Sequence, residues 1–184
     1  MDSLLTPNEV YSVYLDQVSA ADFLWHSRSR LLAEARPGNS FHGLSISELE
    51  ARLRYDREEL DRWASMIMTA SFEAIFWADA NIMLSKRVKD DFCRLIREIY
   101  QKAGENWQRV RFVDLLDQYN SCSSIPATKK NQVNRLFKYR HWIAHGRHWV
   151  EKGVGQPIGP TDAIQIIEEY TEALRLDISD FPLA

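Results

Sequence analysis

Apolar residues near the N-terminus recur at steps of three, four and seven, which is typical of one face of an α-helix. The residues that keep this spacing are Val10, Tyr14, Val18, Ala21, Trp25 and Leu32. Before them, Thr6-Pro7-Asn8-Glu9 supplies a capping hydroxyl, a proline at the first helical position and a glutamate at the third. Because Arg36-Pro37-Gly38-Asn39 ends the pattern, the sequence predicts one long helix before it.

A second long helix is predicted from a capping box at Ser47-Glu48-Leu49-Glu50 to about Ser85, since no glycine or proline interrupts it. Its segment from Trp63 to Leu84 is apolar enough to raise the question of a membrane span. However, that segment contains Glu73, Asp79 and Asn81, and a carboxylate at a bilayer centre costs roughly 2.5–3.5 kcal/mol. We therefore expect a helix inside a bundle and no membrane partner.

The rest of the chain predicts shorter elements of the same kind. Helices are expected from Asp90 to about Ala103, closed by Gly104; from Val110 to Tyr119; from Lys129 to His145, closed by Gly146; and from Thr161 to Leu174. Asn120 to Ser124 is expected to be a loop, and Gly153 to Pro160 a loop or short hairpin. Only Arg147 to Val150 has strand character. The predicted fold is an all-α antiparallel bundle with two long helices.

Composition fits one globular domain spanning residues 1–184, since 45% of the residues are hydrophobic and 27% are charged. The two cysteines, Cys93 and Cys122, are far apart and suggest neither a disulfide framework nor a zinc cluster. The first ten residues do not have the pattern of a secretory signal. These features favour a reducing, cytoplasmic setting.

Charge is unevenly distributed along the chain. The whole sequence has a formal net charge of −3, yet no acidic residue occurs from Gln118 through Val150. The basic residues of that window are Lys129, Lys130, Arg135, Lys138, Arg140 and Arg147, so it carries +6 while the remainder carries −9. A local basic face of this kind can attract an anionic ligand; the alternative is an ordinary solvated helix face.

The end of the basic helix contains the most specific motif. Arg140-His141-Trp142-Ile143-Ala144-His145 resembles the Arg-polar-x-x-x-His signature of the HEPN superfamily, and Gly146-Arg147 follow it as they often do there. The resemblance extends more weakly to Ser71-Phe72-Glu73-Ala74 and covers about residues 45–175. His141 stands where asparagine is common in the family.

The resemblance implies a HEPN-type bundle that cleaves RNA without a metal or other cofactor. The expected products have 2′,3′-cyclic phosphate and 5′-hydroxyl ends. It also implies a homodimer in which two motif helices form a composite active site. Many members of the superfamily are toxins or defence effectors, so an antitoxin protein is a plausible second partner besides RNA.

Helical geometry separates the two motif residues, because Arg140 and His145 project about 140° apart at 100° per residue. They flank a polar face that also includes Asn134 and Lys138. The opposite, apolar stripe consists of Val133, Leu136, Tyr139 and Ile143. The helix is therefore predicted to bury that stripe and to present its motif to a polar cleft.

The residue types suit phosphodiester chemistry. An imidazole can exchange a proton at neutral pH, and a guanidinium offers planar donors to phosphate oxygens. We expect His145 to transfer protons and Arg140 to bind the scissile phosphate, with His141 contacting phosphate or water or orienting His145. Arg147 and His148 could extend the anionic site.

Glu73 is the only charge on an apolar face of its helix and would be costly to bury unpaired. We expect it to pair with Arg140 and to position that guanidinium. Two alternatives are a pair with Arg97 and a carboxylate that reaches solvent at a helix crevice.

Other interpretations of the motif stay open at this stage. His141, His145 and His148 could bind zinc, although their surroundings are cationic. Arg140 and His145 could simply stabilise a helix C-terminus. A noncatalytic HEPN module that binds nucleotide, RNA or protein, and a regulatory bundle with no nucleic-acid role, are the alternatives to an enzyme.

Overall fold

The computed structural model is all-helical over the residues that it describes, which are 5–86, 91–122, 125–145 and 157–174. Its elements are α1 (Pro7–His26), α2 (Arg28–Glu34), α3 (Ile46–Lys86), α4 (Asp91–Lys102), a 3₁₀ turn η1 (Trp107–Arg109), α5 (Phe112–Cys122), α6 (Ala127–Ala144) and α7 (Pro160–Leu174). The prediction of an all-α protein is confirmed. The predicted strand character at residues 147–150 and the hairpin after residue 146 lie outside the described residues.

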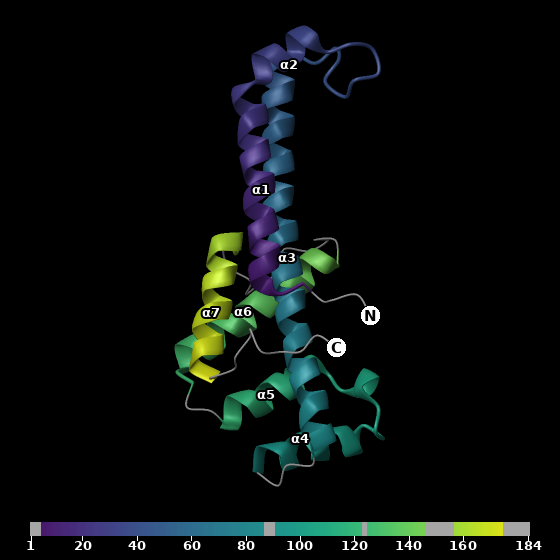
Figure 1. Cartoon of the computed structure of the whole chain (residues 1–184), viewed down its shortest axis with the longest axis vertical. Coiled ribbons are helices and arrows are strands. Elements are labelled where there is room, and N and C mark those ends of the chain that lie inside the picture. The colour runs from purple at the N-terminus through teal and green to yellow at the C-terminus, as the bar shows by residue number, and fades with distance from the viewer. Residues whose placement is uncertain (1–4, 87–90, 123–124, 146–156, 175–184) are drawn as a thin grey trace.

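Helix α3 is the axis of the molecule. At 41 residues it is about 60 Å long, and it packs against each of the other described α-helices. Figure 1 shows α1 and the first half of α3 side by side as an antiparallel pair that projects from the body, with α2 at its tip. Helices α4, α5, α6 and α7 gather around the second half of α3. Among the described residues no helix has the length and apolarity of a membrane span.

The core lies where these shorter helices meet α3. Phe72 and Phe76 of α3 are fully buried, and their rings meet edge to face with centroids 5.0 Å apart. Tyr170 of α7 packs edge to face on Phe72 at 6.0 Å, and Tyr119 of α5 on Phe76 at 4.8 Å. Large aromatic rings in these arrangements provide much of the buried apolar area, so α6 is held against a rigid surface.

Most helix positions agree with the sequence prediction, but the first long helix does not. The chain bends at Ser27 and begins a new helix at Arg28. A serine is a weak helix former, because its side chain competes for backbone hydrogen bonds. The bend brings Arg28 to Glu50 of α3, with Nε 2.7 Å from Oε1. The periodic pattern of apolar residues could not predict this bend, because an ion pair between two helices leaves no trace in such a pattern.

The predicted capping box of the second helix was shifted by two residues. Ser45, not Ser47, precedes the first turn of α3, and its backbone N–H donates to Glu48 Oε2 at 2.8 Å. The Glu48 N–H donates to Ser45 Oγ at 3.3 Å in return. The Ser45 backbone N–H and the Ser45 hydroxyl both donate to the Glu48 carboxylate and hold its pKa below the usual value. Both serines satisfy the motif, so spacing alone could not choose between them.

The predicted loop from Asn120 was also wrong at its start, because α5 runs on to Cys122. Asn120 is buried, and its Oδ1 accepts a hydrogen bond of 2.8 Å from the Tyr170 hydroxyl of α7. This contact between α5 and α7 explains why a polar residue remains helical there. Asp79 of α3 also joins α5, since its Oδ2 accepts a 2.6 Å bond from the Tyr119 hydroxyl.

The register of the α3 cap is testable by two serine substitutions. Ser45→Ala should lower the free energy of unfolding by about 1 kcal/mol, because it removes the capping acceptor, whereas Ser47→Ala should change it much less. Urea denaturation of both variants measures the difference. A larger loss for Ser47→Ala would contradict the observed cap.

The free energy of unfolding should fall at alkaline pH because of Tyr119. Burial, followed by the neighbouring Asp79, raises the pKa of this hydroxyl well above its usual value. A raised pKa in the folded state means that the neutral form contributes its full stability below about pH 10 and loses it as the pH rises further. Urea midpoints between about pH 9 and pH 11 should therefore decline less steeply for Tyr119→Phe than for the wild type. Equal slopes would show that Tyr119 does not carry this dependence.

Candidate functional site

Helix α6 is amphipathic as predicted. Val133, Leu136 and Tyr139 are buried, and Ile143 is half-buried against the core. Lys138, His141 and His145 are exposed on the other side. The apolar stripe fixes the rotation of the helix against α3 and α7, and the motif is therefore presented at the surface.

Arg140 is joined to Glu73 across the contact between α6 and α3. Its Nη1 lies 2.6 Å from Glu73 Oε2, and the two side chains are 35% and 18% exposed. The predicted partner of Glu73 is confirmed. The alternative partner, Arg97, donates instead from Nε to the carbonyl oxygen of Cys93 at 3.1 Å.

The geometry of this contact is that of a charge pair. Among the described residues no donor reaches Glu73 Oε2 with normal hydrogen-bond angles, although Nη1 is close. The other oxygen, Oε1, accepts a 3.3 Å bond from Trp77 Nε1. Glu73 is thus held by its own helix on one side and by Arg140 on the other. About a third of the Arg140 side-chain surface stays exposed.

The two motif histidines meet at the end of α6. Their ring centroids are 4.1 Å apart, and the ring planes are inclined by 56°. His145 follows the last helical residue, and its backbone N–H donates to the carbonyl oxygen of His141 at 3.1 Å. The negative end of the helix dipole favours positive charge at this point, so a structural role for these imidazoles is consistent with the geometry. Their exposure and proximity also allow proton exchange with a bound ligand.

The basic window, residues 118–150, offers fewer cations to a ligand than its sequence indicates. Lys129 Nζ donates to the carbonyl oxygen of Glu169 in α7 at 3.1 Å, and Lys130 Nζ to that of Asn120 in α5 at 2.5 Å. Both lysines therefore stabilise helix packing, and Arg140 is paired with Glu73. The expected basic face is corrected accordingly, because in the described part of α6 at least Lys129, Lys130 and Arg140 contact other helices of the fold. Arg147 and His148 lie outside the described residues.

An open groove runs between α5 and α6, with a volume of about 400 Å³. Three of the predicted site residues, Asn134, Lys138 and His141, line it from α6. The residues that complete this α5–α6 groove are Phe112, Val113, Leu116, Asp117 and Phe137. The groove could not be predicted from the sequence, because its other wall belongs to α5, a helix that carries no motif.

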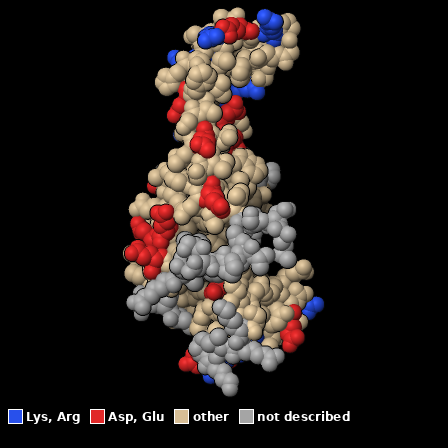
Figure 2. Space-filling view, viewed as in Figure 1, with Lys and Arg blue, Asp and Glu red and all other residues tan. Residues whose placement is uncertain are grey.

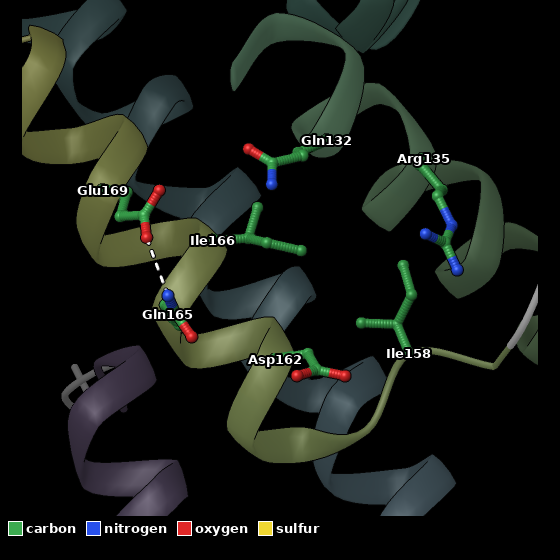
Figure 3. A pocket seen from close by; sticks show the side chains of 7 residues that line it. All are labelled: Gln132, Arg135, Ile158, Asp162, Gln165, Ile166 and Glu169. Carbon is green, nitrogen blue, oxygen red and sulfur yellow. Dashed lines mark hydrogen bonds between the residues drawn. The ribbon is translucent and has the colours of Figure 1, made fainter. Parts of the chain in front are cut away.

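A second hollow, of about 210 Å³, lies between α6 and α7. Figure 3 shows Gln132 and Arg135 on α6 facing Asp162, Gln165 and Glu169 on α7, where Gln165 and Glu169 are hydrogen-bonded at 2.8 Å. Figure 2 shows acidic side chains over α7, whereas the lysines and arginines visible on that face lie toward the two ends of the molecule. The carboxylates of Asp162 and Glu169 make the α6–α7 hollow unsuitable for a phosphate.

No protein-family model matches the chain, and no curated protein or solved structure matches it significantly.

The link between α6 and α3 can be measured by a double-mutant cycle. Combining Glu73→Gln with Arg140→Met should give a coupling free energy on the order of 1 kcal/mol, because the pair is half-buried. The exposed pair Arg111 and Asp114, with Nη2 to Oδ1 at 2.6 Å, is the matched control and should couple by less than about 0.5 kcal/mol. Equal coupling in both cycles would show that Glu73 does not hold Arg140 in solution.

Proposed function

We propose that the chain is a metal-independent endoribonuclease of the HEPN class, with its active site at the end of α6. One observation carries the proposal: two exposed histidine rings lie 4.1 Å apart at the end of a helix on which α3 holds a half-exposed arginine. Imidazoles and a guanidinium are the groups that RNA cleavage requires when no metal takes part.

In the proposed reaction the 2′-hydroxyl oxygen of RNA attacks the adjacent phosphorus, and the bond to the 5′-oxygen breaks. A base removes the 2′-hydroxyl proton, and an acid protonates the departing 5′-oxygen. His145 takes part in this proton transfer, while Arg140 binds the phosphate and stabilises its developing negative charge. The products carry a 2′,3′-cyclic phosphate and a 5′-hydroxyl. The reaction is balanced without a metal or cofactor.

A second copy of the chain completes the site in this proposal. Arg140 is directed toward α3, while the His145 ring lies against His141 at the helix end. Two motif helices related by a two-fold axis would supply a second His145 and a second Arg140 to one cleft. One imidazole could then act as the base and the other as the acid, which makes the homodimer part of the catalytic machinery.

Glu73 is a positioning residue in this scheme. A guanidinium has five N–H donors in a rigid plane, so one carboxylate can fix its direction and leave other donors for a phosphate. The same contact offsets part of the positive charge. A bound phosphate would therefore share Arg140 with Glu73 rather than meet an isolated cation.

That sharing favours the second candidate, a noncatalytic HEPN module that binds nucleotide, RNA or a partner protein. Lys129, Lys130 and Arg140 are all engaged inside the fold, which limits the charge available for stabilising a transition state. As an enzyme the protein would fit a toxin or defence effector that an antitoxin restrains. As a noncatalytic module the protein would bind its ligand at the end of α6 without cleaving it.

The enzymatic proposal predicts the behaviour of His145→Ala. Removing the imidazole should lower RNA cleavage in EDTA by about 10²–10⁴-fold, since it removes proton transfer, while RNA binding changes little. His26→Ala removes an exposed histidine of α1 and should cleave like the wild type. Cleavage is followed by gel electrophoresis of mixed RNA, and binding by titration at low salt. An alanine variant as active as the wild type would rule out His145, and RNA left intact by the wild type would favour the binding module.

A further inference from the structure

The α5–α6 groove has an aromatic floor that the core holds in place. The Phe112 and Phe137 rings have centroids 4.5 Å apart and are inclined by 54°. Phe137 also stacks on the buried Phe72 at 6.0 Å, and Phe112 packs on the buried Phe76 at 5.6 Å. Both rings are half-buried, so each has a fixed orientation and some accessible surface. Such a floor suits a flat aromatic ligand such as a nucleobase, because stacking on a ring does not depend on which polar groups the ligand carries.

The rim of the groove is polar on both sides. Asp117 of α5 lines one wall, and Asn134 and Lys138 of α6 line the other. Within the described ranges, none of these three side chains forms a hydrogen bond or a direct ion pair with another residue, although the charge of Asp117 also acts on Arg111 and Tyr170. This distinguishes them from Lys129 and Lys130 on the same helix, which bind backbone carbonyls. The rim groups can therefore reach a ligand in the groove, with an acceptor on the α5 wall and donors on the α6 wall.

The groove leads to the proposed active site. His141 lines the groove, and its ring lies 4.1 Å from that of His145. Asn134, Lys138 and His141 are four and three residues apart along α6, which places them on one stripe of the helix. A nucleotide whose phosphate reaches the histidines would thus have its base within the groove. The volume of about 400 Å³ lies in the range of roughly 300–1,000 Å³ that is usual for small-molecule sites.

We infer that the α5–α6 groove is a nucleobase-binding subsite that stacks a base on Phe112 and Phe137 and uses Asp117 to select bases with an amino group. The inference rests on the proposed function for its placement beside the scissile phosphate. The pair of half-buried phenylalanine rings and the acceptor and donors on the two walls are observed independently of any catalytic role.

The selectivity follows from hydrogen-bond chemistry. A carboxylate only accepts, and the amino groups of guanine, adenine and cytosine donate. Uracil presents a single ring N–H between two carbonyl oxygens, which a nearby carboxylate repels. Lys138 can meanwhile attract the phosphate or a base carbonyl. Guanine, adenine and cytosine are therefore the preferred occupants, and uracil is disfavoured.

Calorimetric titration of the full-length protein with GMP, AMP, CMP and UMP tests this subsite, because these probes require no cleavage. The wild type should bind UMP roughly tenfold more weakly than the three amino-bearing nucleotides. Asp117→Asn should remove most of that difference, because an amide can both donate and accept. Asp114→Asn is the matched control one turn earlier on α5. Asp114 pairs with Arg111 and does not line the groove, so this variant should keep the wild-type preference.

The outcomes separate this inference from the proposed function. Equal affinity for UMP, an unchanged preference in Asp117→Asn, or no nucleotide binding at low salt would overturn the subsite even if RNA is cleaved. The predicted binding pattern without any RNA cleavage would support the subsite and count against the enzyme. Circular dichroism of each variant confirms that the fold is intact, so a binding loss reports on the groove.

Discussion

A half-buried carboxylate on the central helix is the constraint around which the candidate site is arranged. Glu73 projects from α3 into the contact with α6, where an unpaired charge would be costly, and Arg140 offsets it at 2.6 Å. The pair ties the motif helix to the longest element of the fold. With the buried stripe of Val133, Leu136 and Tyr139, it fixes which side of α6 meets solvent. The histidines and the α5–α6 groove lie on that exposed side because the opposite side of α6 is buried in the core.

The positive charge of the molecule serves packing as well as binding. Lysines that appear in the sequence as a basic face reach across to carbonyl oxygens of α5 and α7. Among the described residues near the motif are two adjacent imidazoles, one shared guanidinium, and Lys138 at the groove rim. Such a site suits one phosphodiester and its neighbouring base better than a long stretch of nucleic-acid backbone, which is usually held by many cations. The overall acidity of the chain is consistent with that restriction.

Features set by local periodicity or by the cost of burying a charge could be predicted from the sequence. These include α6 with its apolar stripe, and the pairing of Glu73 with Arg140, because a lone charge on an apolar face needs a cation. Features that depend on tertiary contacts could not be predicted. Three such features are the bend at Ser27, the extension of α5 through the buried Asn120 and the engagement of Lys129, and each involves a neighbour far away in sequence. The groove was missed for the same reason, since Asp117 lies in a helix without a motif.

We propose that residues at the end of α6 catalyse metal-independent RNA cleavage by proton transfer. The chemical structure of the product ends tests this proposal most directly. RNA incubated with the wild-type protein in EDTA is digested, and the fragment ends are identified by mass spectrometry. The account predicts fragments with 2′,3′-cyclic phosphate and 5′-hydroxyl ends. Fragments with 3′-hydroxyl and 5′-phosphate ends that form only when a divalent metal is supplied would contradict it.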